Sequence, residues 1–450
     1  MKSEQSAFLI AGVNSGSGKT TVTLGLLRAL ARRGLAVAPF KCGPDYIDPL
    51  FHRLAAGCDS HNLDTFLMGS GGVRDSFRRN AAAADAAVAE GVMGLFDGNR
   101  PGSAAGSSAE LAELLELPVL LTVNARGLSG SIAPLVRGFC DWNPRLCIAG
   151  VIANFTGSAR HGELLAESLR LAGLPPLLGA LTRDEAVALP ERHLGLATDA
   201  EADGLIERAA DKVERELDLD RLLDLTRRPV PAAPAAAHPV PVRARLGIAR
   251  DAAFQFYYAD NLAMLEARGV ELVPFSPLAD SALPSGLGGL YFGGGFPELY
   301  AERLAANRAM LDAVREFAAS GRPVWGECGG LLYLLEELTD FDGRRHALAG
   351  VLPGRAKMNR KLAALGYREL ETRMPSCFGP AGTRLRGHEF HYSSAELPSG
   401  ASPLFAARNL RGEAVPSAAG CAAGNVAGSY MHLHFASNPA VPDAFAEALK

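Results

Sequence analysis

The stretch from Phe8 to Leu30 reads FLIAGVNSGSGKTTVTLGLLRAL, and it decides the fold of the first part of the chain. The apolar run at its start predicts a buried strand, the small residues predict a tight loop, and the spacing of the leucines predicts a helix. A strand, a glycine-rich loop and a helix in this order are typical of a phosphate-binding loop. The backbone N–H groups of such a loop and the N-terminus of its helix face one anion.

The candidate nucleotide-binding residues of the loop are Ser15, Gly16, Ser17, Gly18, Lys19, Thr20 and Thr21. Lys19 can reach the terminal phosphates, and the hydroxyl of Thr20 can bind Mg²⁺. The common motif would place a glycine at Val13, whereas this chain has Gly12, one residue further from Gly18. This longer loop resembles that of the dethiobiotin synthetases, a resemblance that favours ATP over GTP. A glycine-rich turn without a ligand is the alternative, but the lysine and both flanking elements argue against it.

Apolar, strand-like runs alternate with helix-like segments through the first half of the chain. This alternation predicts a parallel α/β sheet with helices on both faces. Ligands of such sheets bind at the carboxyl ends of the strands, so the residues after each strand are the candidates for a site. The runs are Phe8–Val13, Ala36–Phe40, Ala87–Met93, Val119–Val123, Ile148–Ala153 and Leu177–Leu181.

Polar side chains follow several of these runs. Asp45 and Asp48 lie in a proline-framed turn after the second run, where they could hold Mg²⁺ or orient a substrate; an acidic turn in solvent explains them equally well. Glu90 falls where the third strand should end and Asp97 lies in the following loop, a placement that suits Mg²⁺ ligands near a phosphate loop. Asn154 follows the fifth run, and its amide can offer a donor and an acceptor to a nucleotide base.

Composition limits the classes of function. The chain has 450 residues, 48% of them hydrophobic, and a net charge of −4 without a long basic run. We therefore expect two or three domains and no nucleic-acid partner. The start of the chain lacks the pattern of a signal peptide, and no apolar run approaches the roughly 20 residues that span a bilayer, so we expect no membrane partner. The seven scattered cysteines include no C-x-x-C pair, which favours the reduced cytoplasm over disulfides or a zinc site.

A change of composition marks the boundary between two domains. Residues 228–245 read RPVPAAPAAAHPVPVRAR, a pattern typical of a stiff linker. We expect an ATP-binding domain at 1–227 and a second domain at 246–450. The second domain begins a new α/β pattern, with strands at Leu246–Ala249, Leu272–Phe275 and Gly289–Phe292 and a helix at Asn261–Arg268.

The second domain contains a pattern that favours a reactive cysteine. Residues 323–330 read PVWGECGG, so that a strand runs into G-x-C-x-G and then into a helix-like leucine stretch. This is the layout of a nucleophile elbow with cysteine in place of serine. We expect the helix start to lower the pKa of the Cys328 thiol and to supply N–H groups to an oxyanion. A buried apolar cysteine is the alternative, which the flanking glycines disfavour.

A thiol nucleophile needs a base, and GSYMHLHF at the C-terminal end offers His432 and His434. In a strand the two histidines would point the same way, which also allows a metal pair, but no third ligand stands out. We favour one of them as the base of the thiol. The stretch GHEFHY alternates as a strand would, with His388 on one face and Glu389 and His391 on the other. It either lines a site or is an ordinary polar strand.

Together the two motifs predict one chemistry, which is ATP-dependent amidation. A carboxylate is a poor electrophile, and ATP can convert it into an acyl phosphate. Ammonia is mostly protonated near neutral pH, and a glutaminase site can release it locally and uncharged from L-glutamine. A phosphate loop and a cysteine–histidine site in one chain would serve these two needs.

The order of the motifs resembles that of the cobyrinic acid a,c-diamide synthase family, also called hydrogenobyrinic acid a,c-diamide synthases. The resemblance covers nearly the whole chain. It implies a P-loop, dethiobiotin-synthetase-like domain followed by a class I glutamine amidotransferase domain with a flavodoxin-like α/β fold. It also implies amidation of the a and c acetate groups of a corrinoid ring with ATP, Mg²⁺ and L-glutamine. The resemblance is carried by SGSGKTT, KCGPDYIDP, EGVMGLFDG, the linker position, GGGFPE, GECGGL, GHEFHYS and GSYMHLHF.

The resemblance implies roles for single residues. Many class I glutaminases carry an acid two residues after the base, where this chain has His434, so a third member of the glutaminase site stays in doubt. The implied residues are Thr20, Asp45 and Glu90 for the metal, Asp48 and Asp97 for the acidic active site or substrate, Asn154 for adenine, Gly294 and Gly329 for the oxyanion, Cys328 as nucleophile and His432 as its base.

Other interpretations stay open at this point. One is an a,c-diamide synthase for another tetrapyrrole, such as nickel sirohydrochlorin, and another is cobyric acid synthase, which usually has a longer chain. A ParA-like switch ATPase would leave Cys328 and His432 without a role. The sequence leaves undecided whether the ring holds cobalt, the order of amidation, the route of ammonia and the oligomeric state, a homodimer included.

Overall fold

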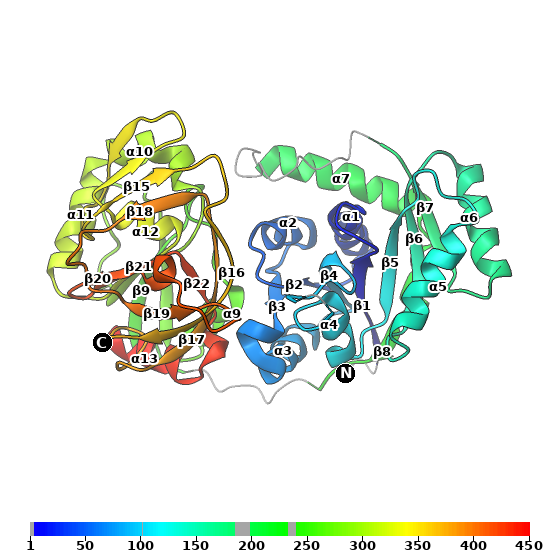
Figure 1. The fold of residues 1–450 in the computed structure, drawn as a ribbon, viewed down its shortest axis with the longest axis horizontal. Coiled ribbons are helices and arrows are strands. Elements are labelled where there is room, and N and C mark those ends of the chain that lie inside the picture. Colours follow the sequence, from blue (N-terminus) through cyan, green and yellow to red (C-terminus); the bar gives the residue numbers. More distant parts are fainter. Residues whose placement is uncertain (1–3, 101, 185–198, 233–239) are drawn as a thin grey trace. The chain divides into compact units, whose positions relative to one another are not determined.

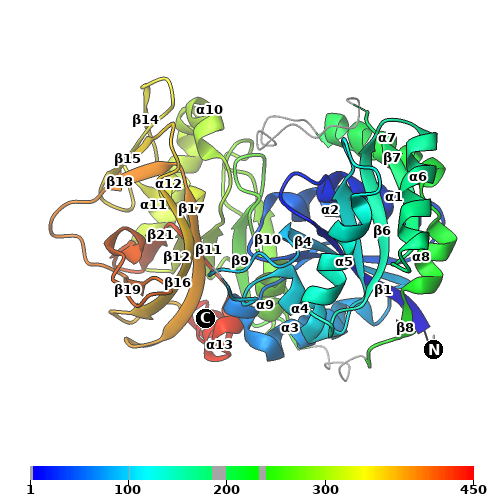
Figure 2. The ribbon, with the colours of Figure 1, turned by 45° about the vertical axis from the view of Figure 1, so that its right-hand side comes forward.

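Residues 4–100, 102–184, 199–232 and 240–450 are described by the computed structural model (Figures 1 and 2). The chain divides into two compact units, Met1–Ala236 and Ala237–Lys450. Each unit has its own parallel sheet and its own hydrophobic core.

The first unit is built on a sheet with the strand order β3-β2-β4-β1-β5-β6-β7. All neighbours in this order are parallel, and helices lie on both sides of the sheet (Figure 1), so the predicted fold class is confirmed. Two strands of 3 residues, β3 and β8, were not predicted, because so short a segment shows no period. The strands are β1 (Glu4–Gly12), β2 (Val37–Cys42), β3 (His61–Leu63), β4 (Ala86–Gly94), β5 (Val119–Asn124), β6 (Ile148–Thr156), β7 (Leu177–Thr182) and β8 (Arg227–Pro229).

The core of the first unit lies between the sheet and a layer of helices. Phe8 and Ile10 of β1, Leu27 of α1 and Val213 of α7 belong to this core and are fully or almost fully buried. Because β1 is buried on both of its faces, as is usual for a parallel sheet, the loop at its end has a rigid base. The helices are α1 (Lys19–Arg32), α2 (Ile47–Ala56), α3 (Thr65–Ala81), α4 (Ser108–Leu115), α5 (Ile132–Trp142), α6 (Ala159–Leu171), α7 (Asp199–Glu216) and α8 (Leu219–Leu225).

The edges of the proline-rich stretch differ from the expected linker 228–245. Its first residues form part of β8, which pairs antiparallel with β1 and therefore belongs to the first unit. Its last residues begin the strand β9 (Ala244–Ala249) of the second unit. Residues 233–239 lie outside the described part of the chain.

The second unit has a six-stranded sheet with the order β10-β9-β11-β12-β21-β20. Neighbouring strands are parallel except for β20, which is antiparallel to β21. All strands predicted at the start of this unit lie in the sheet, and the predicted helix is present as α9 (Ala259–Glu266), slightly earlier in the chain. The remaining strands are β10 (Val270–Phe275), β11 (Gly289–Phe292), β12 (Val324–Glu327), β20 (Cys421–Ala423) and β21 (Val426–Ser429).

Two four-stranded sheets, with the orders β14-β13-β15-β18 and β19-β16-β17-β22, complete the second unit. In β17, Glu389 and His391 are buried whereas His388 and Phe390 are partly exposed, which confirms the predicted alternation. The strands are β13 (Glu337–Thr339), β14 (Arg345–Ala347), β15 (Arg355–Met358), β16 (Ala364–Thr372), β17 (Arg384–His391), β18 (Ser393–Glu396), β19 (Phe405–Arg408) and β22 (Met431–Leu433). The helices are α10 (Ala301–Ala306), α11 (Arg308–Ala319), α12 (Gly329–Leu334) and α13 (Ala440–Ala448), with short 3₁₀ turns η3 (Pro297–Tyr300), η4 (Pro416–Ala419) and η5 (Phe435–Ser437).

All seven cysteines are free thiols. Cys42 and Cys421 are buried, whereas Cys58 and Cys147 are exposed. Among the described residues, none of the helices combines the length and the apolar character that crossing a bilayer requires.

Gly25 of α1 packs tightly against α7, and this packing yields a prediction about stability. A Cβ on Gly25 would lie 2.7 Å from the carbonyl oxygen of Ala209 and from Cγ2 of Val213. We expect Gly25→Ala to push the two helices apart and to lower the free energy of unfolding of the first unit by about 1–3 kcal/mol, measured by urea denaturation. Gly71→Ala in α3 is the control, since a Cβ there would meet no described atom within 4 Å. A similar loss in both variants would contradict the packing argument.

Candidate active sites

The phosphate loop joins β1 to α1 and folds tightly around two glycines. Gly18 has a φ of +85° and forms the N-cap of α1; a Cβ on it would lie 2.0 Å from Nδ2 of Asn154. A Cβ on Gly12 would lie 2.2 Å from Oγ of Ser17 and 3.0 Å from Nζ of Lys19. Only glycine fits at these positions. The glycine at position 12 therefore makes room for the lysine that is expected to contact phosphates.

The hydroxyl of Thr20 meets the carboxylate of Glu90 next to this loop. Oγ1 of Thr20 donates to Oε1 of Glu90 at 2.7 Å. Nζ of Lys41 lies 3.0 Å from the same oxygen and 2.5 Å from Oδ2 of Asp48. The structure therefore brings together three of the predicted residues, from α1, α2 and β4. β4 continues to Gly94, so Glu90 lies within the strand rather than at its end.

Lys41 and His52 belong to this cluster and were not predicted as site residues. Nε2 of His52 lies 2.7 Å from Oε2 of Glu90, and its Nδ1 lies 3.0 Å from Oγ of Ser60. Burial opposes the charge of Glu90, but Lys41 and His52 outweigh it and lower the pKa of this carboxyl well below its usual range. Burial also opposes the charge of Lys41, but Asp48 and Glu90 raise its pKa. The position of Lys41 directly after a predicted strand could have identified it as a site residue. His52 lies in the middle of α2, and no sequence pattern marked it as part of a site.

Asp45 and Asp97 accept hydrogen bonds from backbone N–H groups. Oδ1 of Asp45 accepts from Ile47 at 2.7 Å and from Asp48 at 3.2 Å, at the start of α2. Oδ2 of Asp97 accepts from Gly94 at 2.7 Å. Both side chains thus shape the loops that follow β2 and β4. Their roles toward a metal or a substrate stay predictions.

Asn154 braces the phosphate loop from the end of β6. Its Nδ2 donates to the carbonyl oxygen of Ser17 at 3.1 Å, and its Oδ1 accepts from the N–H of Phe155 at 2.9 Å. The residue is 5% exposed. A contact of this amide with adenine stays a prediction.

The oxygen donors beside the loop fit Mg²⁺. The described residues contain no group of three or more histidine, cysteine, aspartate or glutamate side chains arranged around a metal position. Mg²⁺ that binds with a nucleotide does not need such a group, because it takes one or two protein oxygens together with phosphate oxygens and water. The Thr20 hydroxyl and the Glu90 carboxylate, 2.7 Å apart, are hard oxygen donors of this kind.

Cys328 joins β12 to α12 in a strained backbone conformation, with φ +48° and ψ −99°. The turn is tight, since a Cβ on Gly330 would lie 2.1 Å from the carbonyl oxygen of Phe292. The Cys328 N–H donates to the carbonyl oxygen of Ser429 at 2.8 Å, and Sγ donates to that of Phe390 at 3.8 Å. A positive φ costs a non-glycine residue on the order of 1–3 kcal/mol and is found mostly at functional sites. The turn therefore favours the nucleophile over a merely buried cysteine.

The electrostatics around the thiol correct one expectation. Burial raises the pKa of Cys328. The N–H of Gly329 at the helix start acts in the opposite direction, but its effect is smaller than that of burial. Burial also lowers the pKa of His432 to about 3, helped by His388 and His391. The site therefore holds a neutral thiol and a neutral imidazole, which can accept a proton. The expected net lowering of the thiol pKa is wrong because burial outweighs the helix start.

Two buried side chains fix the segment that carries His432. Oε1 of Glu327 accepts from the N–H of Leu433 at 2.9 Å. Nδ2 of Asn261 donates to the carbonyl oxygen of Leu433 at 2.7 Å, and its Oδ1 accepts from the N–H of Phe435 at 2.8 Å. Burial raises the pKa of Glu327 to about 7. Neither side chain was predicted to matter, although Glu327 directly precedes Cys328.

Gly294 lies against His432 but is not placed as an oxyanion donor. A Cβ on Gly294 would lie 2.5 Å from Cε1 of His432, so only glycine leaves room for the imidazole. The N–H of Gly294 donates to the carbonyl oxygen of Phe256 at 3.2 Å, which argues against its predicted role. Gly329 begins α12 beside the thiol, as predicted. The N atom of Gly295 lies 3.1 Å from where a Cβ on Gly329 would be, which makes Gly295 the better second candidate.

His434 lies outside the strand in which both histidines were expected, because β22 ends at Leu433. Nδ1 of His434 accepts from the N–H of Ala436 at 3.3 Å and caps the turn η5. Burial lowers the pKa of His434 to about 4. Its side chain thus supports the turn that follows the strand of His432.

A buried hydrogen-bond network supports β17, the strand whose Phe390 contacts the Cys328 thiol. Oε2 of Glu389 accepts from Nε of Arg368 at 2.8 Å, and its Oε1 lies 3.0 Å from Nε2 of His391. Nδ1 of His391 lies 2.7 Å from a backbone carbonyl oxygen, and the ring stacks on Tyr430 with 3.6 Å between centroids. The network fixes the backbone at Phe390, whose carbonyl oxygen accepts from the thiol. The stretch GHEFHY therefore lines the site and is not merely a polar strand.

Two family models match the two units. The CobQ/CobB/MinD/ParA nucleotide binding domain matches residues 8–196, which include the phosphate loop and Glu90. The CobB/CobQ-like glutamine amidotransferase domain matches residues 245–440, which include Cys328 and His432.

Several relatives match the chain over nearly its whole length. The cobyrinate a,c-diamide synthase of Syntrophotalea carbinolica is 49% identical over 98% of this chain and 97% of its own. The enzyme of the same name from Dehalococcoides mccartyi is 42% identical over 96% of this chain and 95% of its own. The hydrogenobyrinate a,c-diamide synthase of Brucella suis is 46% identical over 95% of this chain and 98% of its own. The chain belongs to the family of cobyrinate and hydrogenobyrinate a,c-diamide synthases.

Proposed function

We propose that the protein is an ATP-dependent ligase that amidates the a and c acetate groups of cobyrinate or hydrogenobyrinate in cobalamin biosynthesis, with L-glutamine as nitrogen donor. One observation carries this proposal: a single chain holds two sites that need each other. The first is the phosphate loop with the Thr20–Glu90 pair, and the second is the strained turn at Cys328 in the unit that also carries the buried His432. The names of the relatives supply the substrate class.

The first unit would activate the carboxylate. A carboxylate oxygen attacks the γ-phosphorus of ATP, which gives an acyl phosphate and ADP, and ammonia then displaces phosphate from the acyl carbon. Lys19 would place positive charge on the phosphoryl oxygens, where charge spreads in the transition state. Mg²⁺, held by Thr20 and Glu90 when bound, would neutralise further phosphate charge.

The second unit would release ammonia from glutamine. Sγ of Cys328 attacks the amide carbon while its proton passes to His432, and the imidazolium then protonates the departing ammonia. Water hydrolyses the resulting thioester to glutamate. The N–H groups of Gly329 and Gly295 are the donors that we assign to the oxyanion. Because the resting thiol and imidazole are both neutral, the proton needs to move only when glutamine is attacked.

A related synthase for another tetrapyrrole, such as nickel sirohydrochlorin, is the second candidate, since the same two sites would serve it. A ParA-like switch gives Cys328 and His432 no role and is therefore disfavoured. Incubation with ATP, glutamine and each ring, followed by mass spectrometry, tests the choice. Each conversion of acid to amide lowers the mass by about one unit. Conversion of none of the rings would contradict the proposal.

Removal of the thiol should separate the two reactions. We expect Cys328→Ala to abolish glutamine-dependent amidation and to keep amidation with an ammonium salt at mildly alkaline pH, because the variant lacks only the ammonia source. Cys421→Ala is the matched control, since this buried cysteine of the same unit should support both reactions. Loss of both reactions in a folded Cys328→Ala protein would contradict the separate roles.

Substitution of His432 and of His434 should affect different properties of the protein. His432→Gln should lower glutaminase turnover by about 10³-fold or more, because it removes the base of a nucleophile pair. It should also slow alkylation of Cys328 by iodoacetamide. His434→Gln should cost less turnover and act mainly on thermal stability, since His434 caps η5. The reverse order of effects would show that the base is His434.

Lys19→Ala should fail with both nitrogen sources. We expect amidation to fall by about 10²-fold or more with glutamine and with ammonia, since Lys19 serves the phosphoryl transition state. ATP binding, measured by calorimetry, should weaken less, because the loop backbone and the helix N-terminus still hold phosphate. Glutaminase activity without ring substrate should persist. Near wild-type amidation with ammonia would remove the phosphate loop from the reaction.

A further inference from the structure

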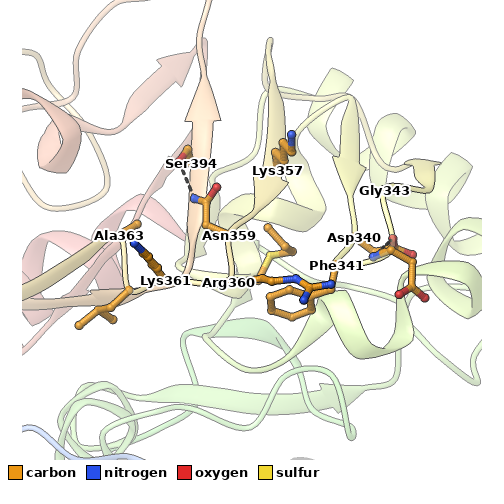
Figure 3. Close-up of a pocket in the computed structure, with 12 residues that line it drawn as sticks. Asp340, Phe341, Gly343, Lys357, Asn359, Arg360, Lys361, Ala363 and Ser394 are labelled. Atoms are coloured by element: carbon orange, nitrogen blue, oxygen red, sulfur yellow. Dashed lines mark hydrogen bonds between the residues drawn. The ribbon is translucent and has the colours of Figure 1, made fainter.

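A hollow of about 810 Å³ lies on the second unit and has no role in the reaction described above (Figure 3). The turn Asp340–Gly343, between β13 and β14, lines one side. Lys357 and Met358 of β15 and the loop 359–363 that follows line the other side, together with Ser394 of β18. Nδ2 of Asn359 donates to Oγ of Ser394 at 2.7 Å, the bond drawn as a dashed line in Figure 3.

The hollow carries cations without acidic partners. Lys357, Arg360 and Lys361 are exposed, and none of them forms an ion pair with any residue that the structure describes. Of the two acids in the lining, Asp340 is already engaged: its carboxylate lies 2.8 Å from Nε2 of His346 and accepts from two backbone N–H groups. The other acid is exposed on the turn. Positive charge therefore prevails on the β15 side.

Lys357 and Arg355 lie on the same face of β15, but they have different cross-strand neighbours. Arg355 lies opposite Glu337 of β13 and Glu396 of β18, so acids flank it on both sides. Lys357 has hydroxyl residues as its cross-strand neighbours on both sides. Cross-strand neighbours are close enough to interact directly. Arg355 thus has an acid opposite it on each side, whereas Lys357 has none, and the charge of Lys357 stays available to a ligand.

The loop 359–363 is held at both of its ends. The N–H of Asn359 donates to the carbonyl oxygen of Tyr392 at 2.6 Å, and the N–H of Ala363 donates to that of His391 at 2.9 Å. The two cations of this loop are therefore carried on an anchored backbone, which reduces the ordering that binding would cost. The anchoring residues also directly follow Phe390, whose carbonyl oxygen accepts from the nucleophile thiol.

Apolar side chains lie among the cations. Phe341 is 42% exposed and Leu362 is 39% exposed, and both line the hollow. A small inorganic anion would use only the charges of this surface. Nucleic acid would need a longer basic stripe than this chain, with its net charge of −4, presents. A flat apolar ring with carboxylates on its rim would match both the cations and the apolar surface.

We propose that this hollow binds the carboxylate-bearing rim of the tetrapyrrole substrate. Lys357, Arg360 and Lys361 pair with carboxylates, while Phe341 and Leu362 contact the ring. The proposal rests on the proposed function, because that function supplies a polycarboxylate ring. It gives the second unit a part in ring binding in addition to the hydrolysis of glutamine.

The test measures cobyrinate on the full-length protein in two ways. Equilibrium dialysis gives its Kd, and ammonia-driven amidation gives its KM without the glutaminase reaction. An exposed ion pair contributes roughly two- to five-fold to binding, so we expect this increase of Kd and KM for each of Lys357→Ala, Arg360→Ala and Lys361→Ala. The triple variant should lose about ten-fold or more, with kcat unchanged. Added salt should weaken binding to the wild type more than to the triple variant.

Arg355→Ala is the matched control, and its Kd for cobyrinate should stay within about two-fold of the wild type, because Arg355 does not line the hollow and has an acid opposite it on each side. A triple variant that binds like the wild type, or an equal loss in Arg355→Ala, would overturn the proposal. If the triple variant keeps its KM with ammonia but fails with glutamine, the surface contacts another protein segment, and the proposal is also overturned. Wild-type protein that binds the ring without amidating it would instead overturn the proposed function alone.

Discussion

A buried glutamate on a central parallel strand holds the reactive groups of each unit in place. Glu90 of β4 is fully buried and accepts from Thr20 and Lys41. Glu327 at the end of β12 is 1% exposed and accepts from the N–H of Leu433, next to His432. A carboxylate removed from water is costly unless it is paired, so each glutamate fixes its partners firmly. The phosphate loop and the histidine segment both depend on this constraint.

The two glutamates provide opposite electrostatic surroundings. Burial works against the charge of Glu90, yet Lys41 and His52 lower its pKa, so an ionised oxygen faces Thr20. Burial raises the pKa of Glu327 to about 7, since its partners are neutral donors. The first unit thus offers a charged cluster suited to a metal nucleotide. In the second unit burial keeps the Cys328 thiol and the His432 imidazole themselves neutral, which suits a reaction that moves a proton only when substrate is present.

The local motifs could be predicted from the sequence, whereas the distant contacts could not. The spacing of apolar residues and the positions of glycines predict the strand–loop–helix at Gly12–Thr20 and the turn at Cys328. Both signals depend on residues only a few positions apart. The oxyanion role predicted for Gly294 is disfavoured because its N–H donates to the carbonyl oxygen of Phe256, a residue of another segment. The prediction of a lowered pKa for the Cys328 thiol was wrong. Burial, which arises only when the unit is packed, raises this pKa by more than the N–H group at the helix start lowers it.

By itself the sequence determined the two α/β folds, the glycine-rich loop after the first strand, the tight turn at Cys328 and the family resemblance, because local backbone geometry and periodicity encode them. Only the tertiary structure decided which side chains support these groups. His52 pairs with Glu90 across 38 residues, and Asn261 holds Leu433 across 172 residues. The periodic spacing of apolar residues, which predicts helices and strands, carries no information about positions so far apart in the chain. They meet because the sheets bring the ends of distant strands together, and a buried polar group must find its partner there.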